Sequence, residues 1–127
     1  MKRLLANIFI IQCLIGCSTI MATSLVDESN VQEIREPITV GQVEKKYGKW
    51  EQGHGPYLWY KSTNEKNEIW FWYLPKKNTP MEKYEVALIT RVDANDADII
   101  NIIWPKKYKN MKFQNVYKNL YHEYEGK

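Results

Sequence analysis

The chain has 127 residues, a formal net charge of +3 and two cysteines, Cys13 and Cys17. This length allows one small domain with a modest hydrophobic core. Two cysteines exclude a disulfide-rich scaffold, and nucleic-acid binding is not expected because the chain has no basic stripe.

The first 16 residues have the layout of a secretory signal. Lys2 and Arg3 provide the charged start, and a short apolar run broken by two polar residues follows them. This layout is typical of a signal peptide. The run is shorter than the about 20 apolar residues that a membrane-spanning helix needs. An uncleaved anchor helix is the alternative.

The sequence LIGC, residues 14–17, resembles the lipobox of bacterial lipoproteins. The resemblance implies cleavage after Gly16, a lipid on the sulfur of Cys17 and acylation of the new amino terminus. Three acyl chains hold a protein on its membrane, because stable attachment takes two or more. Ser18 follows, where an Asp would imply retention in the inner membrane. The expected location is therefore the bacterial outer membrane, facing the periplasm.

Cleavage would leave a mature chain of 111 residues. It removes Cys13, and lipidation uses Cys17, so no thiol remains for a disulfide. Lysine plus arginine falls from 18 to 16 against 15 acidic residues, and the net charge falls to about +1. Residues 17–36 are interpreted as the lipidated cysteine and a flexible tether, with a short helix within 28–36 as the alternative. Residues 37–127 are predicted to form one domain.

The domain is predicted to start with a short helix marked at both ends. Thr39 and Gln42 have the spacing of a capping box. Gly48 provides the left-handed residue that ends a helix. One face of this helix is apolar and carries Val40, Val43 and Tyr47.

Four segments read as strands, because they are rich in aromatic and β-branched residues and are bounded by turn residues. They cover residues 57–62, 68–74, 85–93 and 98–105. The predicted fold class is α+β: a small antiparallel sheet of three to four strands, with helices packed on one face.

The segment EIWFWYLP, residues 68–75, carries aromatic residues on both faces of its predicted strand. Alternation places Phe71 on one face and Trp70 and Trp72 on the other. One face can line the core, and the other is a candidate partner-binding surface, since aromatic residues dominate binding hot spots. The candidate binding residues are Trp70, Trp72, Trp59 and Tyr57. The alternative is that the tryptophans are buried under the C-terminal helix.

The last element, residues 110–125, is predicted to be an amphipathic helix. Its apolar stripe contains Phe113, Val116, Tyr117, Leu120, Tyr121 and Tyr124. The stripe is expected to cover a sheet face, and a partner-binding or membrane-surface helix is the alternative. The lysines at 106, 107, 109 and 112 are expected on a solvated face or near anionic lipid.

No catalytic constellation is present in the sequence. His54 and His122 stand far apart, and the motifs of metal sites, nucleophile elbows and phosphate loops are missing. Residues 93–98, DANDAD, lack the glycine and the closing glutamate of a calcium loop, and they are predicted to form a hairpin turn. The expectation is a protein that is not an enzyme, with no cofactor, no metal and no small-molecule substrate.

The chain resembles the SmpA/OmlA, or BamE-like, family of small outer-membrane lipoproteins over residues 14–104. Besides the lipobox, the likeness rests on the spacing of Thr39, Val43 and Gly48, on WFWY at 70–73 and on the hairpin at 92–100. The sequence departs from the family pattern at Pro37, Tyr47 and Trp50, and it adds a C-terminal helix. The resemblance implies a small α+β sandwich. It also implies a non-catalytic accessory role in outer-membrane protein assembly or envelope integrity, exerted by binding other envelope proteins and in some members phospholipid.

Two other functions fit the same features. One is a lipid-anchored periplasmic inhibitor or immunity-type protein that blocks an enzyme with its aromatic face. The other is a lipid-binding surface protein, which would bind vesicles without its acyl chains.

Overall fold

The computed structural model describes residues 24–125. The predicted signal peptide and the lipobox, with Gly16 and Cys17, lie outside the described residues. Between residues 24 and 125, no helix is long and apolar enough to cross a membrane.

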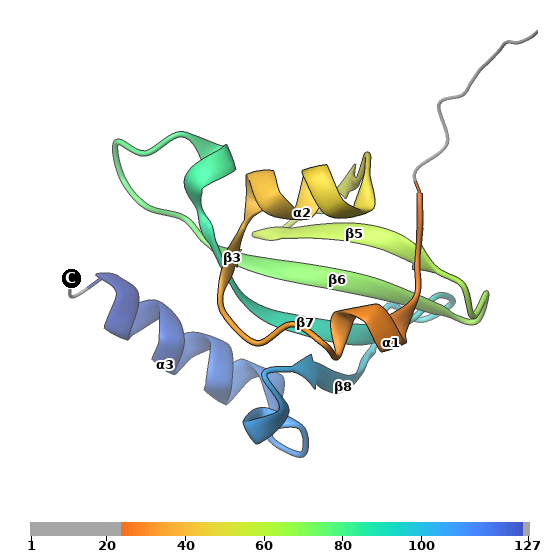
Figure 1. Ribbon diagram of the computed structural model, residues 1–127. Helices are drawn as coiled ribbons and strands as arrows, with labels where there is room; N and C mark the ends of the chain where they lie inside the picture. The colour runs from red at the N-terminus through yellow and green to blue at the C-terminus, as the bar shows by residue number, and fades with distance from the viewer. Residues whose placement is uncertain (1–23, 126–127) are drawn as a thin grey trace, which may run out of the picture.

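A seven-stranded sheet forms the centre of the domain (Figure 1). Its four long strands each run antiparallel to the next one: β5 (Tyr57–Ser62), β6 (Asn67–Leu74), β7 (Glu85–Asp93) and β8 (Ile99–Trp104). Three two-residue strands extend this set: β2 (Leu25–Val26) parallel to β5, β3 (Ile38–Thr39) antiparallel to β7, and β4 (Glu51–Gln52) antiparallel to β5. The four long strands and the α+β class are as predicted.

Helices α1 (Glu28–Val31) and α2 (Val40–Tyr47) cover one face of the sheet (Figure 1). The predicted capping box is present. The backbone N–H of Gln42 donates to the Thr39 hydroxyl at 3.2 Å, and the backbone N–H of Thr39 donates to the Gln42 side-chain oxygen at 2.8 Å. Gly48 ends α2 with φ +89°. Close packing explains why a glycine stands at position 41 inside α2. A Cβ on Gly41 would lie 3.1 Å from the carbonyl oxygen of Glu82.

The main core lies between these helices and the sheet. Buried side chains of α2 and of the strands meet there, among them Val40, Val43, Tyr47, Leu58, Tyr60, Ile69, Phe71 and Ile89. The hydroxyl of Tyr60 donates to the carbonyl oxygen of Gly48 at 2.8 Å, which ties β5 to the end of α2.

The segment before residue 37 belongs to the folded domain, and this corrects the predicted tether. Val26 in β2 and Val31 in α1 are fully buried. Arg91 of β7 pairs with Glu28, with Nε to Oε1 at 2.8 Å, and the Trp104 indole donates to the Ile34 carbonyl oxygen at 2.6 Å. The predicted boundary at 37 is therefore wrong, and the alternative of a short helix within 28–36 matches α1.

Helix α3 (Phe113–Glu125) packs on the opposite face of the sheet from α1 and α2. A second cluster of buried residues lies beneath it, formed by Trp72, Leu88, Ile102 and Val116. The Tyr117 hydroxyl donates to the Tyr73 carbonyl oxygen at 2.8 Å. The prediction placed helices on one face only. Because β6 carries apolar side chains on both faces, each face needs a cover.

Candidate aromatic binding face

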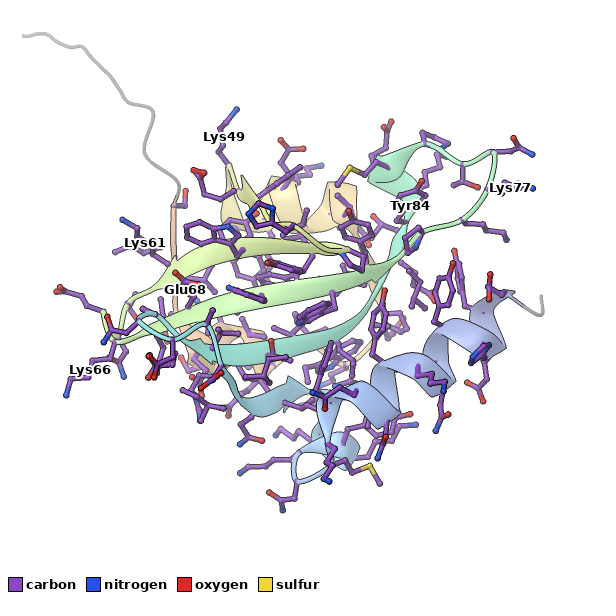
Figure 2. The ribbon with its side chains drawn as sticks, turned by 180° about the vertical axis from the view of Figure 1, so that it is seen from behind. Lys49, Lys61, Lys66, Glu68, Lys77 and Tyr84 are labelled. Carbon is purple, nitrogen blue, oxygen red and sulfur yellow. The ribbon has the colours of Figure 1, made fainter. Side chains whose placement is uncertain are left out.

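The candidate site lies on the sheet face that α3 covers only in part. Three half-buried aromatic side chains remain beside the helix on this face, Tyr57 and Trp59 from β5 and Trp70 from β6. We call these three residues the aromatic face. Figure 2 shows this side of the sheet, with α3 crossing one end of it.

Strand register brings the aromatic face together. Trp59 lies opposite Trp70, and Tyr57 lies opposite Trp72, so side chains from both strands point to the same side. The rings of Tyr57 and Trp70 are stacked, with centroids 4.0 Å apart and planes 4° apart. The Trp70 indole also donates to a Glu68 carboxylate oxygen at 2.9 Å. Stacking and this hydrogen bond hold the Trp70 side chain in one orientation before any partner arrives.

Trp72 does not belong to the aromatic face. It is 8% exposed, and its ring lies 4.3 Å from Phe113 and 5.7 Å from Tyr117 of α3. Its indole nitrogen donates to the hydroxyl of Thr90 at 3.0 Å, inside the structure. The prediction of a partner-binding role for Trp72 is therefore wrong, because α3 covers it, and the alternative of burial under the C-terminal helix holds for this residue.

The row of aromatic rings continues beyond the predicted residues. Phe113 and Tyr117 stack at 5.6 Å, and Tyr117 and Tyr121 stack at 6.3 Å along α3. These residues join the aromatic face to the helix through Trp72. The amphipathic stripe signalled that they are apolar and on one side of a helix. The stripe does not indicate which strand these three side chains contact.

The electrostatics of this region are mild. Burial raises the pKa of the Tyr117 phenol, which donates to the Tyr73 carbonyl oxygen where α3 meets the sheet. The charged side chains next to the aromatic face are Lys61 and Glu68, which are cross-strand partners, and Glu51, which lies opposite Trp59. The face therefore offers flat apolar rings with one cation and two anions at its border.

The other predicted features lie apart from the aromatic face. His54 is exposed in the loop after β4, and His122 is exposed on α3. Asp93 caps its own turn, since its carboxylate accepts from the amides of Asn95 at 2.8 Å and Asp96 at 3.0 Å. Between residues 24 and 125, no group of three or more His, Cys, Asp or Glu side chains is placed to hold a metal.

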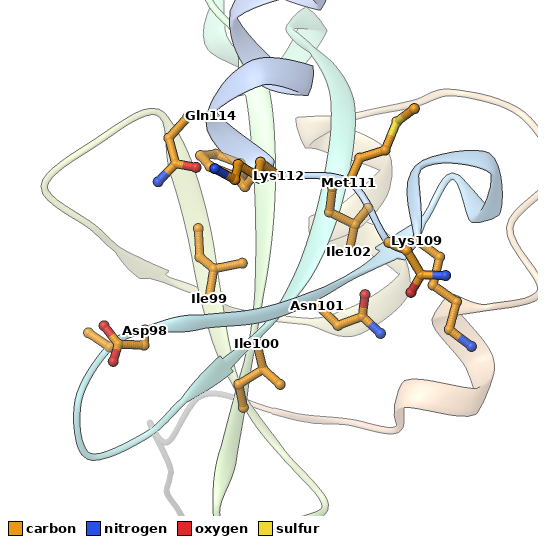
Figure 3. A pocket seen from close by; sticks show the side chains of 12 residues that line it. Asp98, Ile99, Ile100, Asn101, Ile102, Lys109, Met111, Lys112 and Gln114 are labelled. Carbon is orange, nitrogen blue, oxygen red and sulfur yellow. The ribbon is translucent and has the colours of Figure 1, made fainter.

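A hollow of about 840 Å³ lies between β8 and the segment that leads into α3 (Figure 3). The charged residues of its lining are Asp98, Lys109 and Lys112. Its lining also includes Ile102 of β8 and Met111, and none of the predicted site residues lines it.

Comparison of the chain with protein-family models, with curated proteins and with solved structures finds no match. The resemblance to the SmpA/OmlA family therefore stays a prediction. The residues that carry the helix part of this resemblance, Thr39 and Gly48, mark the two ends of α2.

Proposed function

We propose that the chain is a non-catalytic, lipid-anchored envelope lipoprotein. In this proposal it acts as an accessory or scaffold for outer-membrane protein assembly or envelope integrity, and it works by binding another envelope protein. The observation that carries the binding role is the aromatic face, formed by Tyr57, Trp59 and Trp70. The lipobox at residues 14–17 supports the anchor and the location.

The aromatic face has the properties of a binding hot spot. Trp and Tyr are enriched where interfaces gain most of their energy, and each side chain offers a large apolar area with few rotatable bonds. The stacked rings of Tyr57 and Trp70 are already ordered. A partner therefore pays little of the usual cost of about 0.5–1.5 kcal/mol for immobilising each flexible side chain.

Photocross-linking in intact cells tests the proposal. A photoreactive amino acid replaces Trp59 in the otherwise unchanged chain, and the control places it at Gln42, which is exposed on α2 over the opposite face. We expect position 59 to yield a cross-link to an envelope protein and position 42 to yield none. Equal products from both positions, or none from position 59, would refute binding by this face.

The anchor is tested in the same cells. The substitution Cys17→Ala removes the predicted lipid attachment point, and we expect the protein to leave the membrane fraction. Retention of the Cys17→Ala chain in the membrane would show that the lipobox does not anchor it.

The identity of the cross-linked protein separates the proposal from its alternative. The rigid rings of the aromatic face also suit insertion into an enzyme cleft, as an inhibitor or immunity-type protein would require. A soluble periplasmic enzyme recovered one to one would favour that alternative. A component of outer-membrane assembly machinery would favour the accessory role.

A further inference from the structure

Strand β8 forms an edge of the sheet. Among the described residues it pairs with β7 alone, so its other side has no strand against it. The last three residues of β8, 102–104, are buried. The first half is open, because Ile100 is exposed and Ile99 and Asn101 are only half-buried. An open edge presents unpaired N–H and C=O groups, which can pair with a strand of another chain.

The hollow between β8 and the segment that leads into α3 follows this edge. Four consecutive residues of β8, 99–102, line it, and residues 109–114 line it from the other side. Successive side chains of a strand point to opposite faces of the sheet. A hollow that all four residues line therefore runs along the edge of β8 and not over one face of the sheet.

Two apolar side chains of this hollow are exposed. Ile100 is 50% exposed and Met111 is 56% exposed, and both line the hollow. Ile100 is the extra residue of a β-bulge, because consecutive residues of β7 lie opposite Asn101 and Ile99 and none lies opposite Ile100. A bulge re-aims a side chain, and this one leaves Ile100 outside the core. Contact with a second apolar surface would remove both exposed side chains from water, which is favourable.

The end of the edge where β8 begins is negative. The turn that leads into β8 contains Asp93, Asp96 and Asp98. The Ala94 amide donates to the carbonyl oxygen of Lys66 at 3.0 Å, which places one cation beside the turn. Three acids outweigh this cation.

The other end of the edge is positive. From residue 99 to residue 122 the sequence contains five lysines and no acidic residue. Lys109 and Lys112 line the hollow, and Glu123 of α3 is the acid that lies beside Lys112 in a neighbouring hollow. Figure 3 shows Asp98 at one end of β8 and Lys109 beside the other end. The charge of the edge therefore changes sign along the strand.

We propose that a second copy of this chain binds along the edge of β8, with the two β8 strands antiparallel about a two-fold axis near Ile100. In this arrangement Asp98 lies opposite the partner's Ile102, at the end of the partner strand where Lys109 lies (Figure 3). The axis repeats this contact between acid and lysine, so it occurs twice. A parallel arrangement would set acids against acids and lysines against lysines.

The antiparallel arrangement also closes at two copies. A two-fold axis uses the same surface on both chains, so each open edge covers the other and no edge is left for a third copy. Ile100 and Met111 of each copy are covered in the same step. The bulge and the buried end of β8 keep the pairing short, as is usual at sheet edges that must not form fibres. This inference uses neither the lipid anchor nor the aromatic face.

Two charge reversals test the arrangement. Asp98→Lys sets lysine against lysine at both contacts of a pair, and Lys109→Asp sets acid against acid at both. An exposed ion pair favours association by roughly twofold, and each reversal loses two attractions and adds two repulsions, so it should weaken pairing by about 15-fold. In a mixed pair of the two variants, both contacts join an acid with a lysine again.

The experiment uses two differently tagged copies of the full chain in the same cells. After mild detergent extraction in physiological salt, one tag is purified and the amount of the other tag is measured. We expect parent copies to be recovered together, each reversal paired with itself to lose this recovery, and Asp98→Lys with Lys109→Asp to regain it. Glu44→Lys and Lys45→Asp make the same charge changes at exposed positions of α2 and should change nothing.

Each other result overturns the inference. Parent copies that are never recovered together would show that the edge binds no second copy. Recovery that survives both reversals would mean that the copies meet elsewhere or on a common partner. Two reversals that each abolish recovery and do not restore it when mixed would exclude the antiparallel arrangement. Equal losses from the α2 variants would remove the assignment to β8.

Discussion

Replacing Thr90 by valine tests the burial of Trp72 under α3. The Thr90 hydroxyl accepts the indole N–H of Trp72 at 3.0 Å, and Thr90 is fully buried. Valine has nearly the same shape but no acceptor, so the indole N–H would be left without a partner. A buried donor without a partner costs about 1–3 kcal/mol. If Trp72 lay on an open surface instead, water would take the place of the hydroxyl at almost no cost.

The net cost follows from two opposing effects. The new methyl group of valine recovers up to about 0.8 kcal/mol by burial of apolar area. We therefore expect Thr90→Val to lower the free energy of unfolding by about 1–2 kcal/mol. With a urea dependence of about 1–3 kcal/mol per molar, the unfolding midpoint should fall by roughly 0.3–2 M.

Urea unfolding followed by circular dichroism measures this change, with Trp72→Phe as the second arm of a double-mutant cycle. Phenylalanine has no N–H, so the valine substitution should cost at least about 1 kcal/mol less in that background. An unchanged midpoint for Thr90→Val, or equal costs in the two backgrounds, would refute the burial of Trp72.

Three further substitutions test other parts of the fold, each by urea unfolding. Val26→Ala should lower the free energy of unfolding by about 2–3 kcal/mol, because it removes two buried methyl groups and leaves a cavity. Thr39→Ala should cost about 1 kcal/mol through loss of the capping box. Hydrogen bonds from Arg91 hold the pKa of Glu28 below its usual value, so the pair stabilises the fold above pH of about 4.3 and loses this effect as pH falls through the lower folded pKa. At pH 7, Glu28→Gln should cost about 0.5–1 kcal/mol, and the difference from the parent chain should disappear in acid.

Each of these predictions has a result that contradicts it. A Val26→Ala chain as stable as the parent would restore the predicted tether. An unaltered midpoint for Thr39→Ala would mean that solvent replaces the cap without loss. A cost of Glu28→Gln that persists unchanged at low pH would assign the effect to packing and not to the ion pair.

The sequence predicted those elements whose signals are local. Helix α2 carries its own capping box and its terminating glycine within ten residues. The strands β5 to β8 were predicted because their apolar and aromatic residues lie in short runs bounded by turn residues. Alternation along β6 also placed Trp70 and Trp72 on the face opposite Phe71, as the structure has them.

The N-terminal part of the domain could not be predicted in this way. Strand β2 has two residues, too few for any periodic pattern. Its neighbour in the sheet is β5, and Glu28 finds its partner 63 residues further along the chain. Contacts at such separation leave no local mark in the sequence, and the polar end of this segment resembled a tether.

The candidate site was predicted in part for the same reason. Tyr57, Trp59 and Trp70 could be placed on one face, because register and alternation follow from a short hairpin. Which face α3 covers depends on the direction of the chain after β8, and an amphipathic stripe does not contain that information. The sequence therefore leaves the burial of Trp72 as one of two alternatives.

The packing of α1 also constrains the order of assembly. A chain that emerges from its point of synthesis or transport does so with the N-terminus first. The carbonyl oxygen of Ile34 can therefore accept the indole N–H of Trp104 only after the next 70 residues have emerged. Until that hairpin arrives, Val26 and Val31 have no complete core to enter, so we expect the first segment to appear to be among the last to settle.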